Sequence, residues 1–281
     1  MDFIRSDLAC EYLKEDQRLD TKKGYTVSNY SENGFPIIEV DIKNDIGEKA
    51  FGRKKGKYIT VCIGKGWLYD DNIFSKIRHV VAQKLGKIIF SKNDSFSNIL
   101  IAGLGNRAIT SDALGPLTID RINVARHLDI SKSVFLMSPG IVAKTGIESA
   151  DHIKSITKEI NADCVILIDA LAARSVDRLC STVQISNVGL MPGSGIGCFN
   201  KEISKTSLGV SVFSIGVPTI VSSSTMIYDM LNESGITSIS EDLKKVLENG
   251  KSFFVTPNET DIIVSSLADL LASAIEKALN R

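Results

Sequence analysis

Apolar strand patterns alternate with helical patterns through the second half of this chain, and no other feature of the sequence restricts its fold so strongly. The strand patterns cover residues 98–103, 134–138 and 164–169, and the helical patterns between them cover 113–128 and 146–161. Strands that alternate with helices form βαβ units, in which parallel strands are joined by right-handed crossovers. The sequence therefore predicts an α/β fold with a mostly parallel sheet flanked by helices.

The first 95 residues are less regular and predict a mixed α/β extension of that sheet. Strand patterns cover residues 37–42 and 57–64, and a basic turn with two glycines, GRKKGKY (52–58), leads into the second of them. A helical pattern follows at 71–89. After the regular part, three further strand patterns cover 182–186, 212–216 and 253–256. A long helical pattern at 256–279 ends the chain's predicted elements. We expect two portions, a mixed one at 1–95 and an α/β core at 96–281, packed as one compact unit.

Charge and apolar content exclude several kinds of partner. The 33 basic and 33 acidic residues give a formal net charge of zero, unlike a general binder of nucleic acid or anionic membranes. No uninterrupted apolar run approaches the roughly 18 residues that span a bilayer, and the N-terminus has no signal-peptide pattern. The five cysteines occur singly, as reduced thiols do, at Cys10, Cys62, Cys164, Cys180 and Cys198. We therefore expect a cytoplasmic protein with no direct nucleic-acid contact and no membrane contact.

Two acidic residues follow strand patterns of the predicted sheet. Asp112 comes after the strand at 98–103 and its glycine turn, and Asp169 ends the apolar run CVILI. Ligands collect outside the carboxyl ends of parallel strands, so the two carboxylates are expected to meet in one cleft. Asp112 also stands where a helix begins and would serve there as an N-cap. A carboxylate in a buried strand is costly unless it is paired or functional, which makes Asp169 the stronger candidate.

Such a pair of carboxylates performs acid/base chemistry without a cofactor. Two carboxyl groups a few ångströms apart do not both ionise easily and tend to share one proton. The charged partner then activates water, and the neutral partner protonates the leaving group, as in hydrolysis of a peptide bond. A helix dipole near Asp112 and the burial of Asp169 favour Asp112 as the base and Asp169 as the acid.

The glycine turn GLGNRA (103–108) also has the spacing of a dinucleotide-binding loop. The helix that should open within such a loop begins late, and the next strand lacks the acidic residue that would bind a ribose. We expect Gly103, Gly105 and Asn106 instead to bring backbone amides close to a substrate.

Metal and serine chemistries find little support in the sequence. The histidines His79, His127 and His152 lack metal-ligand spacing, and no G-x-S-x-G motif is present. The glycine-rich segment MPGSGIG (191–197) lacks the Gly-Lys-Ser/Thr ending of a P-loop, so it indicates an anion-binding loop or a mobile flap. The sequence thus predicts no metal site and no cofactor.

Several motifs taken together resemble one family. They are GLGNRAITSDALGP, SPGIVAKTGIES, CVILIDALAARS, TVQIS, PGSGIG, KEIS, SIGVPTIV and VTPNETD. From Arg5 to the C-terminal helix the chain resembles the germination protease of spore-forming bacteria. The resemblance implies an atypical aspartic endopeptidase that starts the degradation of small acid-soluble spore proteins, with Asp112 and Asp169 as its catalytic pair. It also implies a fold similar to that of hydrogenase maturation endopeptidases.

The resemblance further implies a zymogen, a homotetramer and a place in the cytoplasm of the spore core. The family's propeptide lies ahead of the segment resembling RSDLACE, where residues 1–4 stand here, so we expect at most a very short propeptide. An implied preference for acidic side chains near the cleaved bond requires cations, for which Arg107, Lys144 and Arg174 are candidates, with a structural salt bridge as the alternative role of each. The alternatives are a metal-dependent maturation-type peptidase and a non-catalytic peptide-binding protein.

Overall fold

The computed structural model describes residues 6–12, 24–91, 95–123, 132–197, 200–236, 238–249 and 253–280, and nine strands in these ranges share one sheet. Their order across the sheet is β1 (Tyr25–Glu32), β2 (Phe35–Ile42), β3 (Gly56–Cys62), β7 (Thr182–Ser186), β8 (Ser211–Ser222), β6 (Cys164–Ala173), β4 (Asn98–Gly103) and β5 (Ser133–Met137). The short strand β9 (Phe254–Val255) pairs with the end of β8.

The sheet has a parallel half and an antiparallel half. Strands β8, β6, β4 and β5 run parallel, as the alternating pattern predicts. Strands β1, β2, β3 and β7 pair antiparallel and join β8 through β7. The predicted α/β fold with helices flanking a parallel sheet is therefore confirmed, and the N-terminal strands extend that same sheet.

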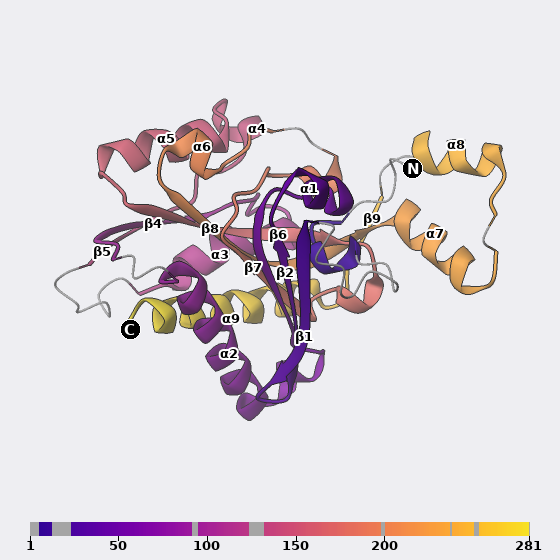
Figure 1. The fold of residues 1–281 in the computed structure, drawn as a ribbon, viewed down its shortest axis with the longest axis horizontal. Coiled ribbons are helices and arrows are strands. Elements are labelled where there is room, and N and C mark those ends of the chain that lie inside the picture. Colours follow the sequence, from indigo (N-terminus) through magenta and orange to yellow (C-terminus); the bar gives the residue numbers. More distant parts are fainter. Residues whose placement is uncertain are drawn as a thin grey trace.

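Helices cover both faces of the parallel half (Figure 1). Helices α2 (Asp71–Ile89), α3 (Leu114–Arg121) and α9 (Thr260–Leu279) pack on one face, and α5 (Ser149–Glu159) and α6 (Lys205–Leu208) on the other. Side chains of a strand point alternately to its two faces, so Ile99 and Ile101 of β4 join the first core while Leu100 and Ala102 join the second. This two-sided burial explains why the central strands are continuously apolar.

Shorter helices lie at the ends and edges of the sheet. They are α1 (Asp45–Phe51), α4 (Val142–Thr145), α7 (Ser223–Glu233), α8 (Glu241–Asn249) and the 3-10 turns η1 (Ala9–Tyr12), η4 (Gly66–Tyr69), η5 (Thr110–Asp112), η7 (Val176–Arg178) and η8 (Ser194–Ile196). Helices α7 and α8 project away from the sheet beyond β9 (Figure 1). Within the described ranges, no helix combines the length and the apolar character needed to cross a membrane.

Several element boundaries differ from the sequence predictions. The helix at 71–89 is confirmed without change, whereas the helix predicted at 113–128 is present as α3 to Arg121, and residues 124–131 lie outside the described ranges. The helix predicted at 146–161 begins at Ser149, because Gly146 adopts a left-handed conformation and ends the separate helix α4. The strand predicted to end at Asp169 continues to Ala173, because β8 pairs with it over this whole length.

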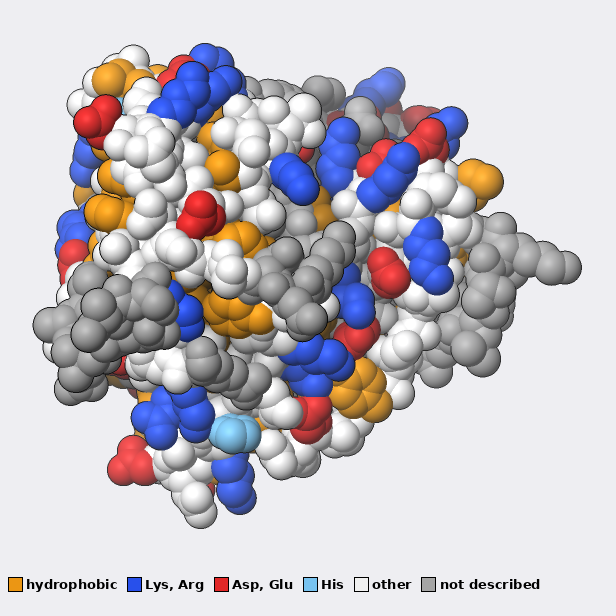
Figure 2. All heavy atoms as spheres, turned by 60° about the vertical axis from the view of Figure 1, so that its left-hand side comes forward, with side chains coloured by type: hydrophobic (Ala, Val, Ile, Leu, Met, Phe, Trp, Pro, Cys, Tyr) orange, Lys and Arg blue, Asp and Glu red, His pale blue; other side chains and the backbone are white. Residues whose placement is uncertain are grey.

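Charged side chains are mixed over the surface. On the face in Figure 2, lysine and arginine side chains lie among aspartate and glutamate side chains. The four cysteines within the described residues, Cys10, Cys62, Cys164 and Cys180, are free thiols, and Cys198 lies outside those residues. Zero net charge and single cysteines in the sequence agree with both observations.

Candidate active site

The glycine turn after β4 holds Asp112 in place. The backbone N–H of Asn106 donates to Asp112 Oδ2 at 2.7 Å. Gly105 has a φ of 113°, and a Cβ there would overlap the Asp112 carbonyl oxygen. A Cβ on Gly103 would overlap the Gly115 backbone of α3 in the same way. These residues therefore fix the path of the chain around Asp112, and none of the three predicted there as substrate-binding lines the cavity.

The Asp112 carboxylate does not cap the following helix. Ala113 occupies the N-cap position of α3, and no side chain accepts a hydrogen bond at that helix start. The carboxylate instead turns back to the glycine loop, where it accepts the Asn106 N–H. The N-cap alternative is therefore wrong.

Asp169 lies within β6 rather than at its end. Strand β4 stops where Gly103 pairs with Ile168, so Asp169 is the first residue of β6 beyond this neighbour. On the other side it faces Gly216 of β8, where a Cβ would lie 2.6 Å from the Asp169 carbonyl oxygen. Its side chain is buried, with 8% exposed, and accepts the Ala170 N–H at 3.0 Å. Asp169 therefore lies at the edge of the sheet where the sequence placed it, although β6 continues beyond it to Ala173.

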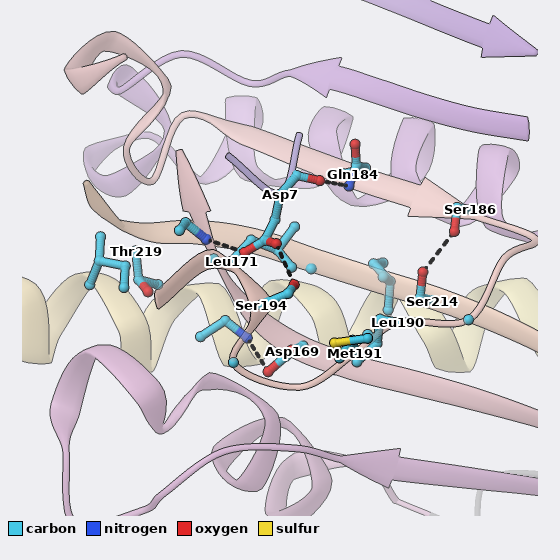
Figure 3. Close-up of a pocket in the computed structure, with 18 of the residues that line it drawn as sticks. Asp7, Asp169, Leu171, Gln184, Ser186, Leu190, Met191, Ser194, Ser214 and Thr219 are labelled. Atoms are coloured by element: carbon cyan, nitrogen blue, oxygen red, sulfur yellow. Dashed lines mark hydrogen bonds between the residues drawn. The ribbon is translucent and has the colours of Figure 1, made fainter. Parts of the chain in front are cut away.

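Both carboxylates line one cavity of about 480 Å³ (Figure 3). Apolar side chains form much of its wall, among them Leu171, Leu190, Met191, Ile215 and Ile220. The loop between β7 and α6, which contains the glycine-rich segment, covers one side of the cavity. The cavity is therefore largely apolar with a few polar groups, as ligand sites in proteins commonly are.

The environment raises the pKa of both carboxyl groups. Burial raises the pKa of Asp169 well above its ordinary value, and the negative charges of Asp112 and Asp7 raise it further. Burial also raises the pKa of Asp112, while the Asn106 N–H bond lowers it. Since a raised pKa keeps a carboxyl group protonated to higher pH, Asp169, with the larger rise, is the one that holds its proton to the higher pH.

Besides Glu202, the cavity has a further acidic residue, Asp7, which the sequence did not indicate as a site residue. Its side chain lies beside Ser194 in the cavity wall (Figure 3). Asp7 follows no strand or glycine turn, so no local pattern placed it at the carboxyl edge of the sheet. Its position within the segment RSDLACE, which the family resemblance included, was the one available signal.

The cations of the cavity come from the turn after α1. Arg53 and Lys54 line the cavity. Within the described ranges, no other lysine or arginine lines it. Arg107, Lys144 and Arg174, the candidates from the sequence, do not line it. The basic turn GRKKGKY was noted in the sequence, but nothing there placed it beside Asp169.

The three candidate cations occupy other environments. Arg107 pairs with Asp120, with 2.8 Å between Nη2 and Oδ1. Arg174 donates to both oxygens of Asp229, at 2.7 Å from Nη2 to Oδ1 and 3.0 Å from Nε to Oδ2. The Lys144 side chain is exposed on α4. Their contact with substrate stays a prediction.

The described part of the chain contains no arrangement of three or more His, Cys, Asp or Glu side chains that could hold a metal ion. His79 lies near Lys277 on the surface, at 3.0 Å between Nδ1 and Nζ. His152 Nδ1 lies 3.3 Å from the Pro139 carbonyl oxygen. His127 lies outside the described residues.

The chain is similar to one family over most of its length. A family model described as germination protease matches residues 5–233. The germination protease of Clostridium acetobutylicum is 37% identical over 315 aligned residues, which span 99% of this chain and 96% of that protein. The germination proteases of Caldanaerobacter subterraneus and Bacillus subtilis are 36% and 31% identical, over 98% and 99% of this chain and 94% and 93% of their own.

One similar solved structure is a [NiFe] hydrogenase maturation protease from Thermococcus kodakarensis. It matches 70% of this chain and 99% of its own length, with a TM-score of 0.41 and 16% sequence identity.

Proposed function

The chain belongs to the germination protease family, and we propose that it is an endopeptidase in which Asp112 and Asp169 activate one water molecule. Membership of this family makes it a peptidase of spore germination. The observation that supports the mechanism is that two carboxyl groups from different strands line one cavity, where burial raises the pKa of each. The pKa of Asp169 is raised more strongly than that of Asp112, and two carboxyl groups can divide the acid and base roles only when their environments differ in this way.

The two environments suggest which residue starts in which form. Asp112 is partly buried and accepts an N–H, so it ionises at lower pH than the more deeply buried Asp169, whose pKa the neighbouring acidic charges also raise. Ionised Asp112 takes a proton from water while the water oxygen attacks the peptide carbonyl carbon. Asp169 then donates its proton to the departing peptide nitrogen, and the C–N bond breaks. A proton passes from Asp112 to Asp169 before the next cycle, because the pair holds one proton at rest.

We propose small acid-soluble spore proteins as the substrate, with acidic side chains near the cleaved bond. Arg53 and Lys54 provide positive charge at the cavity and would pair with such side chains. The same proposal includes a homotetramer in the spore core and synthesis as a zymogen. Light scattering of the purified protein tests for the tetramer. The intact mass before and after activation tests for the loss of an N-terminal peptide.

Substitution of each aspartate tests the mechanism. Asp112→Asn and Asp169→Asn should each lower kcat on a small acid-soluble spore protein by about 10²- to 10⁴-fold, the usual value of a proton-transfer group. Asp151→Asn is the matched control, because Asp151 pairs with Lys201 outside the cavity. Near-normal turnover by either cavity variant would remove that residue from the mechanism.

Two further measurements separate the alternatives. Cleavage that continues in excess chelator would exclude the metal-dependent peptidase. Binding of the spore protein without any turnover would favour the peptide-binding protein over an enzyme.

A further inference from the structure

We propose that Asp7 is a positioning residue of this site: the N-terminal segment and the glycine-rich loop hold its carboxylate in the wall of the cavity that Asp169 also lines, and from there it acts on Asp169. The inference rests on the proposed function, because it concerns the residue assigned there as the acid. It also assigns a purpose to the segment 6–12 and to the glycine-rich loop, neither of which the reaction itself uses.

The backbone of Asp7 is fixed against β6 and β7. Its N–H donates to the Ala172 carbonyl at 2.7 Å, and its side-chain Oδ2 accepts the Ala172 N–H at 2.9 Å. Gln184 of β7 donates from Nε2 to the Asp7 carbonyl at 2.8 Å and accepts the Ala9 N–H at 2.8 Å. The segment thus pairs with the part of β6 that extends past β4, three residues beyond Asp169.

The glycine-rich loop closes over the Asp7 carboxylate. Ser194 donates from Oγ to Asp7 Oδ1 at 2.9 Å, as Figure 3 shows. A Cβ on Gly195 would overlap Asp7 Oδ2, so the glycine leaves room for this oxygen. Arg53 Nη2 lies 3.6 Å from Oδ1 and donates to the Ser6 carbonyl. The neighbours of this side chain are hydrogen-bond donors and a cation, so each of its two oxygens serves as an acceptor.

The charge of Asp7 acts on Asp169 from one side of the cavity. The other ionisable groups around the cavity are Asp112 from η5, Arg53 and Lys54 from the turn after α1, Tyr58 from β3 and Glu202 from the loop before α6. The negative charges of Asp7 and Asp112 both raise the pKa of Asp169, in the same direction as its burial. A like charge nearby disfavours ionisation, so removal of the Asp7 charge makes Asp169 lose its proton at lower pH.

A role as a mere tether for segment 6–12 would give a different result, and Glu11 provides the comparison. Glu11 lies in the same segment and accepts the N–H groups of Arg174 and Ser175 at 2.8 and 3.0 Å. It therefore anchors the segment as Asp7 does. Its charge is not among those that shift the pKa of Asp169. Glu11→Gln thus weakens the anchoring without the charge effect.

The experiment measures Asp169 directly. The carboxyl carbon of Asp169 is titrated by NMR in ¹³C-aspartate-labelled full chain, with its signal assigned through Asp169→Asn. Asp7→Asn should move this titration, and the alkaline limb of kcat/KM on a small acid-soluble spore protein, to lower pH. Glu11→Gln should leave both in place. Asp7→Glu, which restores the charge, should recover most of the shift.

A second variant leaves the charge in the chain and displaces it. Gly195 does not have a positive φ, so Gly195→Ala strains no backbone angle, but its Cβ would overlap Asp7 Oδ2 and would also lie 2.6 Å from the Cβ of Ala172, so both the Asp7 carboxylate and the loop must shift. This variant should shift the titration in the same direction as Asp7→Asn. An unchanged Asp169 titration in Asp7→Asn, or an equal shift in Glu11→Gln, would overturn the proposal. If the wild type cleaves nothing at any pH, the proposed function fails, while the NMR titration still decides the role of Asp7.

Discussion

Replacement of Asp169 by asparagine is predicted to stabilise the fold at neutral pH even though it removes catalysis. The side chain is 8% exposed, and the hydrogen bond found for it comes from the Ala170 N–H, which an amide oxygen accepts equally well. Asparagine thus keeps the shape and this bond but carries no ionisable group. Burial that raises the pKa of Asp169 destabilises the wild type at pH 7 by about 1.4 kcal/mol for each unit of the shift, so we expect the variant to gain stability of about that size. In a chain of this size the gain is roughly 2–6 °C in Tm.

The pH dependence of the gain follows from the direction of the pKa shift. The pKa of Asp169 is raised in the folded state by burial and by its acidic neighbours, above an ordinary value of 3.8. Below pH 3.8 both the folded and the unfolded wild type hold the proton, and the variant has no advantage. Between the unfolded and the folded pKa, only the unfolded chain gains by ionising, so the stability of the wild type falls as pH rises. The difference between the two proteins should therefore grow with pH and then level off.

Urea unfolding of both proteins at several pH values measures this difference. Asp151→Asn serves as the control, since an exposed ion pair with Lys201 contributes about 0–1 kcal/mol. An Asn variant that is no more stable than the wild type at pH 7 would show that Asp169 is not strained by burial. A stability gain that is as large at pH 3 as at pH 7 would show that it does not arise from ionisation.

Three further predictions concern the cavity and the loops that form it. Lys54→Gln should raise KM for a peptide with acidic residues beside the cleaved bond by about tenfold and leave a neutral analogue unchanged, whereas Arg174→Gln should not discriminate between them, because Arg174 pairs with Asp229 outside the cavity. Gly103→Ala should destabilise the protein by about 1–3 kcal/mol in urea unfolding, since the added Cβ overlaps the backbone at Gly115. Activity should persist in excess chelator, and a loss that zinc or magnesium restores would contradict the carboxylate mechanism.

The parallel core was predictable because its pattern is dense and local. Strands β4, β5 and β6 are apolar on both faces, and the helical period of 71–89 is long and regular. The strand β1 was not predicted because four of its eight residues are exposed in succession, so its sequence YTVSNYSE lacks clear alternation. Helices α7 and α8 were not predicted because they project from the sheet and bury few of their side chains.

The site was predictable only where it depends on strand ends. Asp112 follows β4, and Asp169 is the first residue of β6 beyond the end of β4, so the rule for parallel strands placed both at the same edge of the sheet. Asp7 and Arg53 reach that edge by long-range contacts, through Ala172, Gln184 and the turn after α1. Contacts between residues so far apart in the sequence leave no periodicity in it. The cations were therefore sought near the catalytic motifs, at Arg107, Lys144 and Arg174, whereas the cavity receives its cations from a distant turn.

The extension of β6 and β8 beyond β4 connects these observations. Because β6 continues for four residues past Asp169, its backbone still has donors and acceptors there that β4 does not satisfy. Along one edge of this extension β8 pairs with β6. Along the other edge, which β4 leaves free, the Asp7 segment pairs with Ala172. An unpaired strand edge at a substrate cavity would be available to any extended peptide. The position of the N-terminal segment on this edge thus determines both how much of β6 a substrate can reach and which charge lies next to Asp169.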